Sequence, residues 1–271
     1  GALVGCPGLA AWVYALRGAA KAAGGIGVKD CALRWVAGHE QLGESSWFRI
    51  GDKDLATHLM RTDSLRQGRR LTETALDLCR RFALDATVLP MADEKVRTRF
   101  STDDGEFSFQ EYFVRERLGP ALRHIEFAGI ESARPTSEVL AALIEADLVV
   151  IGPSNPLISI APILRVLGSH VPRDRTVAIS PIVGGVSLKG PTVSMMQAIG
   201  LDASPVAVAE MYMNVASAFA IDARDAELAP KIEGLGYRAI VCDTVMKDGG
   251  RGLAAAIVDA LPSAPMSSPE T

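Results

Sequence analysis

The sequence predicts an α/β protein built on a doubly wound, mostly parallel sheet. Short apolar, β-branched runs recur at residues 148–151, 176–179 and 239–242, and segments with helical spacing separate them. Each run ends abruptly in turn-forming or polar residues. This alternation is typical of βαβ units, whose crossover helices cover both faces of a parallel sheet. We therefore expect a Rossmann-like architecture.

Length and composition limit the possible classes of protein. A chain of 271 residues with 48% hydrophobic and 22% charged residues has the composition of a globular protein. We expect a single α/β domain over residues 1–261, an inserted subdomain at about 90–122, and a disordered Pro/Ser-rich tail at 262–271. A net charge of −4 without a long basic run argues against nucleic acid as a partner.

The sequence also argues against a membrane protein and a zinc protein. No apolar stretch is long enough to span a membrane, and the alanine-rich residues 1–23 lack the basic start of a signal peptide. Four cysteines and four histidines are scattered without the spacing of a zinc site. A reduced, cytoplasmic setting is the simplest expectation.

The first third of the chain is expected to be mainly helical. Residues 24–27 (Gly-Gly-Ile-Gly) follow no strand, which favours a loop over a phosphate-binding turn. The expected helices cover residues 11–22, 30–42, 55–62 and 72–83, and short strands are expected at 47–50 and 86–89.

One of these helices carries a first group of candidate site residues. Its spacing places Leu55, Leu59 and Met60 on one apolar face. Asp52 or Asp54 is placed to cap its start, and His58 and Arg61 share a face with Asp54. Simpler interpretations are equally consistent with the sequence. Asp54 then only supplies a negative charge at the start of the helix, and His58 is a partly buried helix histidine. An acid, a histidine and an arginine together are a better site candidate than any one of them.

The expected insert differs in pattern from the rest of the chain. Residues 97–101 and 106–109 alternate in polarity around Asp103-Asp104-Gly105, which predicts a β-hairpin. Residues 110–117 then show helical spacing. A subdomain beside the main sheet and a simple edge elaboration are equally consistent with this pattern.

Strand and helix alternate regularly from residue 123 onward. We expect the run at 148–151 to be the buried, central strand of the sheet. The other strands are expected at 125–127, 176–179, 216–221 and 239–242, and the helices at 137–145, 158–167, 192–199, 205–214, 225–233 and 252–260.

A second group of candidates follows the ends of these strands. The stretch Gly152-Pro153-Ser154-Asn155-Pro156 ends one strand, Ser180-Pro181 the next, and Asp243-Thr244 a third. Ligands of open α/β sheets bind at the carboxyl ends of strands, which predicts a nucleotide-sized ligand here. A tight turn in which Asn155 caps its own backbone is the competing interpretation. Lys189 precedes a helix, a position that favours binding of an anion. The default interpretation of a lone lysine is a solvated surface residue.

Several short motifs together resemble one known family. They occur in the family's order along nearly the whole chain, from about Pro7 to the last helix: Gly51-Asp52-Lys53-Asp54, Ala56-Thr57-His58 with Arg61, Leu89-Pro90-Met91, Phe109-Gln110-Glu111, Gly152-Pro153-Ser154-Asn155-Pro156, Ser180-Pro181-Ile182, Lys189-Gly190-Pro191 and Asp243-Thr244-Val245-Met246. In this pattern the chain resembles the 2-phospho-L-lactate transferase family of deazaflavin coenzyme F-420 biosynthesis. Each motif is weak alone, and the ordered set is specific.

The resemblance implies a reaction and its partners. A guanosine-diphosphate-linked phospholactate, phosphoenolpyruvate or phosphoglycerate would donate its phospho-acid unit to a ribityl hydroxyl of 7,8-didemethyl-8-hydroxy-5-deazariboflavin, releasing GMP with the help of Mg²⁺. It also implies a homodimer. Asn155 and Ser154 are expected at the nucleotide and Lys189 at the diphosphate. Asp52, Asp54, His58 and Arg61 are expected at the acceptor or the metal, with Asp52, Asp54 and His58 as catalytic candidates. The remaining substrate-binding candidates are Arg49, Thr57, Gly152, Pro156, Ser180 and Pro181.

The chain departs from the family pattern in its first quarter. Gly8 and Ala10 stand where the family has the aspartates of a Ser-Pro-Asp-Leu-Asp-Thr motif, and neither side chain can bind a hard cation. The opening strand and Gly-Gly-x-Gly loop of the family have no counterpart, so this part is expected to be eroded or truncated. A catalytically dead homologue that still binds guanine nucleotide or deazaflavin is therefore the alternative to the transferase. An unrelated nucleotide-binding α/β protein is a third, weaker possibility.

Overall fold

The computed structural model describes residues 7–18, 29, 31–43, 47–188 and 190–260. The chain packs into two compact units. Unit 1 consists of residues 1–121 and 126–141, and unit 2 of residues 122–125 and 142–271. Strand β3 (Leu122–Ala128) and helix α5 (Ser137–Glu145) each have residues in both units. The expectation of a single domain over residues 1–261 stays a prediction.

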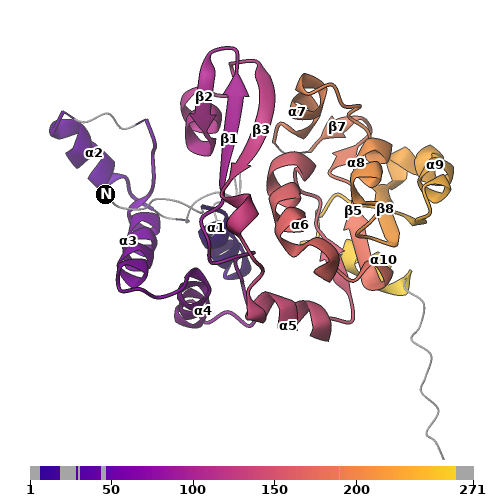
Figure 1. Ribbon diagram of the computed structural model, residues 1–271, viewed down its shortest axis with the longest axis horizontal. Coiled ribbons are helices and arrows are strands. Elements are labelled where there is room, and N and C mark those ends of the chain that lie inside the picture. The colour runs from indigo at the N-terminus through magenta and orange to yellow at the C-terminus, as the bar shows by residue number, and fades with distance from the viewer. Residues whose placement is uncertain (1–6, 19–28, 30, 44–46, 189, 261–271) are drawn as a thin grey trace, which may run out of the picture. The chain divides into compact units, whose positions relative to one another are not determined.

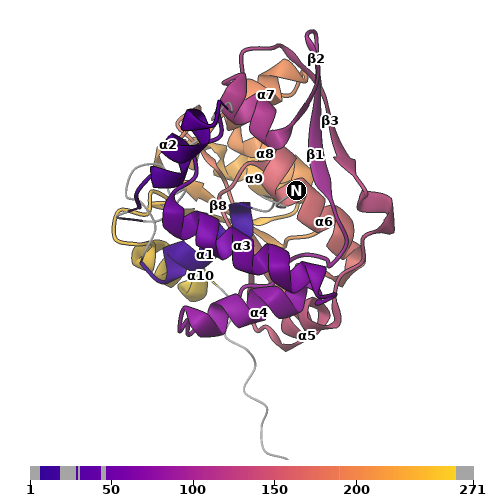
Figure 2. The ribbon, with the colours of Figure 1, turned by 90° about the vertical axis from the view of Figure 1, so that its left-hand side faces the viewer.

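Helices α1 to α4 and a hairpin make up most of the described part of unit 1. Helices α1, α3 and α4 lie side by side in Figure 2, with α4 in contact with both of the others. The hairpin strands pair antiparallel with Phe100 opposite Phe107, as the alternating pattern predicts, and β3 continues this sheet in the order β2-β1-β3. The elements are α1 (Pro7–Leu16), α2 (Arg34–Gln41), α3 (Asp52–Arg66), α4 (Leu71–Arg81), β1 (Arg97–Thr102), β2 (Gly105–Ser108), the π-turn η1 (Glu111–Arg115) and the 3-10 turn η2 (Ile130–Ser132).

Unit 2 contains the predicted parallel sheet. Its strand order is β4-β5-β8-β9, and all three pairings are parallel. The strands are β4 (Val149–Ile151), β5 (Thr176–Ile179), β8 (Ala218–Asp222) and β9 (Arg238–Cys242), with a small hairpin of β6 (Ile182–Val183) and β7 (Val186–Ser187). The α-helices are α6 (Ala161–Leu167), α7 (Thr192–Ala198), α8 (Pro205–Tyr212), α9 (Ala229–Gly234) and α10 (Arg251–Asp259). Shorter turns are η3 (Pro156–Ile160), η4 (Gly168–His170), η5 (Arg173–Arg175) and η6 (Ala223–Leu228).

The sheet of unit 2 is covered on both faces, which confirms the doubly wound α/β fold. Phe219 and Ile221 pack on one face with residues of α8 and α9, including Tyr212 and Ile232. Val177 and Ala220 belong to the other face, where Leu253 and Ile257 of α10 cover them. Figure 1 shows α8 and α9 beside β8, and α10 in yellow. Burial on both faces explains why these strands are short, continuous apolar runs.

The position predicted for the strand at 148–151 is wrong. Within the described sheet β4 is an edge strand, and Val150 is 45% exposed. A β-branched run predicts a strand equally well at an edge or in the centre, because sequence order does not give spatial order. Similarly, the strand predicted at 125–127 exists as part of β3, but it belongs to the sheet of the hairpin.

Two short predicted strands do not form in the described residues. At 47–50, the Ile50 carbonyl accepts a hydrogen bond from the Trp35 indole, and Trp47 packs against Phe48 and under Arg115. At 86–89, the Val88 backbone bonds to the Cys79 thiol. Side chains take the place of a neighbouring strand in both segments. The Gly-Gly-Ile-Gly stretch at 24–27 and the predicted tail at 262–271 lie outside the described residues.

Candidate functional site

Helix α3 buries a polar face. Its buried residues are Thr57, His58, Arg61, Thr62 and Ser64. Leu59, one of the three apolar residues predicted to share a face, is 52% exposed. Burying polar groups costs free energy unless they find partners, so this face has to be explained by its neighbours.

The start of α3 also differs from the prediction. Gly51 is the N-cap residue, without a side-chain cap, and Asp52 and Asp54 lie in the first turn. Neither carboxylate caps the helix as predicted, although both lie where the helix dipole favours negative charge. A Cβ atom on Gly51 would lie 2.1 Å from the Cys31 sulfur, so only glycine fits here without movement.

The Asp54 carboxylate connects two helices. The Tyr14 hydroxyl of α1 donates a 2.9 Å hydrogen bond to Asp54 Oδ1, and His58 Nε2 lies 3.5 Å from the same oxygen. Tyr14 and His58 are both buried, at 1% and 3% exposure. Burial raises the pKa of Tyr14, and the Asp54 charge raises it further, while a hydrogen bond with Thr57 opposes the rise. Tyr14 is thus a neutral hydrogen-bond donor at physiological pH.

His58 is held in its neutral form. Burial lowers the pKa of His58 most, and the nearby Arg61 charge lowers it further, against the opposing effect of Asp54. Its other ring nitrogen, Nδ1, is buried and has no hydrogen-bond partner within the described residues. Buried polar atoms are nearly always bonded, so this nitrogen departs from the usual pattern.

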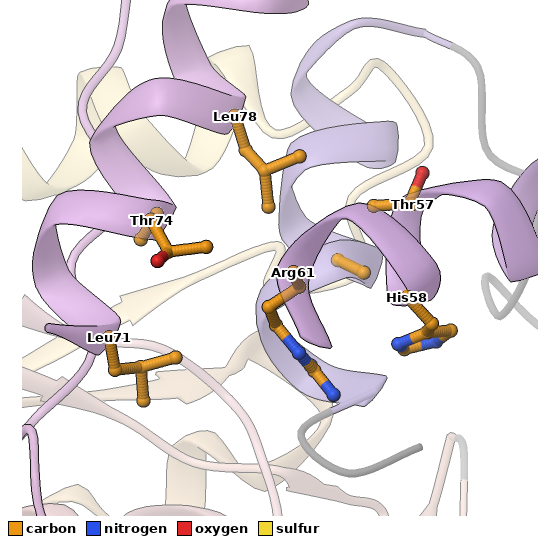
Figure 3. A pocket seen from close by; sticks show the side chains of 8 residues that line it. Thr57, His58, Arg61, Leu71, Thr74 and Leu78 are labelled. Carbon is orange, nitrogen blue, oxygen red and sulfur yellow. The ribbon is translucent and has the colours of Figure 1, made fainter. Parts of the chain in front are cut away.

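A small cavity adjoins this histidine. It measures about 10 Å³, about the space that one water molecule needs. Figure 3 shows His58, Arg61 and Thr57 reaching it from α3, and Leu71, Thr74 and Leu78 from α4. Ala10 of α1 and Ala75 of α4 complete its lining. Ala10 is 4% exposed, so it is packed into the core of unit 1.

Two further predicted residues lie at the start of α3 and just before it. Asp52 has a buried Oδ1 that lacks a hydrogen-bond partner within the described residues. Arg49 is exposed and lies 3.8 Å from Glu40. The first group of candidates therefore belongs to unit 1, together with Arg49 and Thr57, and the second group belongs to unit 2.

The exit of β4 forms a tight turn. The Asn155 side chain accepts a 2.9 Å hydrogen bond from Leu157 N–H, so the predicted backbone cap is present, and its amide donates to the Met195 sulfur. Asn155 and Pro156 are buried, whereas Gly152 and Ser154 are exposed. A Cβ atom on Gly152 would meet nothing within 4 Å, which leaves its backbone open to a ligand.

The exit of β5 is likewise held by its own loop. The buried Ser180 hydroxyl donates to the Ile182 carbonyl and accepts from Ile182 N–H, and Pro181 is buried beside it. The next turn is held by Asp225, whose two oxygens both accept from Gly184 N–H. Lys189 lies outside the described residues.

The exit of β8 carries an aspartate that sequence reasoning missed. The Asp222 carboxylate accepts from the backbone N–H groups of Arg224 and Thr244 and from both of their side chains, at 2.8–3.1 Å. Burial alone would raise the pKa of Asp222, but these hydrogen bonds lower it to about 2. The signal was an acid directly after a buried strand. Tyr14, also missed, gave only the weak signal of a tyrosine in an alanine-rich helix.

Side chains of the kinds that bind metal ions are scattered among the described residues. The described part of the chain contains no group of three His, Cys, Asp or Glu side chains that could hold a metal ion. Asp54 Oδ1 is already engaged by Tyr14 and His58. Among the described helices, none has the length and apolar character to cross a membrane.

Comparison with known proteins connects these features to one family. Residues 23–242 match the family described as 2-phospho-L-lactate transferase CofD. The chain is 36% identical over 222 residues to the 2-phospho-L-lactate transferase of Methanosarcina acetivorans, covering 81% of this chain and 72% of the relative. It is 33% identical over 256 residues to the phosphoenolpyruvate transferase of Streptomyces avermitilis, covering 90% and 79%.

A solved structure supports the fold independently. A crystal structure of a UPF0052 family member from Bacillus halodurans superimposes with a TM-score of 0.50 at 16% identity, over 78% of this chain and 73% of that one. Similarity at this level of identity concerns the fold alone. The family match and the curated relatives extend over most of the chain, and they agree with the motifs found in its sequence. The chain belongs to the 2-phospho-L-lactate transferase family.

Proposed function

We propose that this protein transfers a phospho-acid unit from a guanosine-diphosphate-linked donor to the deazaflavin 7,8-didemethyl-8-hydroxy-5-deazariboflavin, releasing GMP, in coenzyme F-420 biosynthesis. The observation that carries this proposal is the family match over residues 23–242 together with relatives named as such transferases. The phospho-acid is phospholactate, phosphoenolpyruvate or phosphoglycerate. The names of the relatives include both a 2-phospho-L-lactate and a phosphoenolpyruvate transferase, so the donor has to be determined by assay.

The two groups of candidate residues suit the two substrates. At the exit of β4, the exposed Ser154 and the open backbone of Gly152 are suited to a nucleotide, with Asn155 holding the turn in shape. In unit 1, the neutral His58 beside a small cavity is suited to a hydroxyl group of the acceptor. The cavity is far too small for a deazaflavin ring, so the proposed ring site lies outside it.

Magnesium and a homodimer are part of the proposal by family resemblance. Mg²⁺ is commonly bound by one or two carboxylates together with substrate phosphates, so a chain without a ready-made ligand group can still require it for turnover. Removing Mg²⁺ with a chelator should abolish turnover. Light scattering should give twice the mass of the 28.7 kDa chain.

A binding protein without catalytic activity is the second candidate. The absence of a three-ligand metal group among the described residues favours it, as do Gly8 and Ala10 at the positions of family aspartates. Such a protein would bind guanine nucleotide or deazaflavin and turn over neither.

A turnover assay separates the two candidates. The purified chain would be mixed with the deazaflavin, Mg²⁺ and each of the three donors in turn, and the products would be weighed by mass spectrometry. We expect a phosphodiester-linked deazaflavin and one equivalent of GMP with one donor. Deazaflavin binding without product under all three conditions would contradict the transferase and support the binding protein.

A further inference from the structure

A methionine of α7 contacts the turn at the exit of β4. The side-chain amide nitrogen of Asn155 donates a hydrogen bond to the sulfur of Met195, and these two atoms are 3.5 Å apart. Both residues are buried, at 9% and 3% exposure. They lie 40 positions apart in the sequence, so this bond joins two separate segments of unit 2.

The bond to the sulfur helps to fix the orientation of the Asn155 amide. The amide oxygen accepts from Leu157 N–H at 2.9 Å, and the Asn155 backbone carbonyl accepts from the N–H groups of Ser159 and Ile160. Turning the amide over would exchange its oxygen and its nitrogen. The nitrogen would then face the Leu157 N–H, and the oxygen would face the lone pairs of the Met195 sulfur. The sulfur therefore opposes the wrong orientation.

Met195 also belongs to the helix that follows the motif Lys189-Gly190-Pro191. Its backbone N–H donates to the Pro191 carbonyl at 2.9 Å, in the first turn of α7. The family resemblance implies a diphosphate contact in this motif and a nucleotide contact at the exit of β4. Met195 is thus bonded to both segments, to one through its backbone and to the other through its side chain.

We propose that Met195 is a positioning residue for the nucleotide: its sulfur fixes the Asn155 amide, and the turn thereby keeps Ser154 in place for the guanosine diphosphate of the donor. This inference rests on the proposed transferase function and adds to it a residue that acts through Asn155. Ser154 is exposed, and its N–H donates to the Gly152 carbonyl at 2.8 Å within the same turn. A change in the turn therefore moves the group that is offered to the ligand.

The neighbouring Met196 provides a matched control. It is fully buried and packs in the apolar core of unit 2 with Ile151 and Tyr212. Its sulfur accepts no hydrogen bond from the residues that the structure describes. Leucine has nearly the volume of methionine and lacks the sulfur, so both methionines can be replaced at a similar packing cost. Only Met195→Leu also removes a hydrogen-bond acceptor.

The first measurement is the affinity for guanosine diphosphate by calorimetric titration. Because a thioether is a weak acceptor, Met195→Leu should weaken binding by about three- to fivefold, and Met196→Leu should leave it unchanged. Met195→Gln supplies an amide oxygen as acceptor and should regain most of the affinity, although a buried amide should lower its melting temperature. The leucine variant should thus be the more stable of the two and the weaker binder.

The second measurement observes the Asn155 amide itself. The chain contains two asparagines, Asn155 and Asn214, so ¹⁵N-asparagine labelling gives two side-chain amide signals, which Asn155→Ala assigns. We expect the Asn155 amide protons to exchange slowly with solvent in the wild type and in Met196→Leu, and faster in Met195→Leu. If the protein turns over, Met195→Leu should raise KM for the donor and leave kcat unchanged.

The outcomes separate this inference from the proposed function. An unchanged affinity in Met195→Leu, or an equal loss in Met196→Leu, would overturn the positioning role. Faster exchange at Asn155 with unchanged affinity would overturn it as well, since the bond would then support the fold alone. The expected affinities without any product would contradict the transferase and leave Met195 as a positioning residue of a nucleotide-binding protein. A wild type that does not bind guanosine diphosphate would overturn both.

Discussion

The polar side chains at the strand exits of unit 2 and those at the start of α3 in unit 1 are satisfied in different ways. At the strand exits of unit 2, Asn155, Ser180 and Asp222 each bond to backbone groups of their own or a neighbouring loop. On α3 of unit 1, Asp52 Oδ1 and His58 Nδ1 are buried without a partner among the described residues. The three side chains at the strand exits thus have hydrogen-bond partners, whereas the two atoms on α3 can still accept a hydrogen bond.

This difference suggests how each region takes part in function. Loops whose own bonds are complete present an unchanging backbone, which suits recognition of a nucleotide through exposed groups such as Ser154. Unbonded buried atoms beside a cavity suit a group that arrives with the substrate.

The largest effect is expected at Asp222. The Asp222→Ala variant would leave the buried N–H and hydroxyl groups of Thr244 without their acceptor and release Arg224 as well. We expect a loss of about 3 kcal/mol in the free energy of unfolding, measured with urea. Asp243→Ala, which removes an exposed acid that accepts from Val245 N–H, should cost at most about 1 kcal/mol. Equal losses would contradict the scaffold role.

The next effect concerns the start of α3. In Gly51→Ala the new Cβ atom would lie 2.1 Å from the Cys31 sulfur, which also accepts from Lys53 N–H. Overpacking of this kind should cost about 2 kcal/mol. The double variant with Cys31→Ala should recover most of the loss, as measured by thermal unfolding. A single variant as stable as the wild type would show that the helix start can move freely.

The two units should respond to acid at different pH. Asp222 has a pKa lowered to about 2, so its contribution of about 2 kcal/mol is present above its unfolded value near 4 and is lost as pH falls toward 2. His58 has a lowered pKa, so stability should decline already below its unfolded value of about 6.5. The free energy of unfolding would be measured with urea at pH values from 8 to 2. The decline that begins below about pH 6.5 should be absent in His58→Gln, and the decline between about pH 4 and pH 2 should be absent in Asp222→Asn. A single step unaffected by either variant would refute this assignment.

The smallest effect is expected at Arg70. Its guanidinium contacts Glu138 at 2.7 Å, Asp93 at 3.3 Å and Glu73 at 3.4 Å, but this group is solvent-exposed. Arg70→Lys should therefore lower the melting temperature only slightly, and less in 0.5 M salt than in dilute buffer, because salt screens exposed charges. A loss as large as that of Asp222→Ala would show that the bridge is a main support of unit 1.

Much of unit 2 could be predicted from its sequence, because its strands are apolar on both faces and end in turn residues. The strand at 176–179 occurs with the predicted bounds, and so does the helix at 137–145, which has residues in both units. Unit 1 was harder to predict, because α3 turns polar residues inward and Leu59 outward, against the usual rule. The bond between Tyr14 and Asp54 depends on tertiary packing, and no local pattern reports it.

Binding measurements on two variants test the division between the two regions most directly. Calorimetric titrations with guanosine diphosphate and, separately, with the deazaflavin would compare Asn155→Ala and His58→Gln with the wild type. Asn155→Ser serves as a control that keeps an oxygen for capping the turn. We predict that Asn155→Ala weakens only nucleotide binding, that Asn155→Ser weakens it less, and that His58→Gln weakens only deazaflavin binding. Unchanged nucleotide affinity in Asn155→Ala, or the loss of both ligands in either variant, would contradict the account.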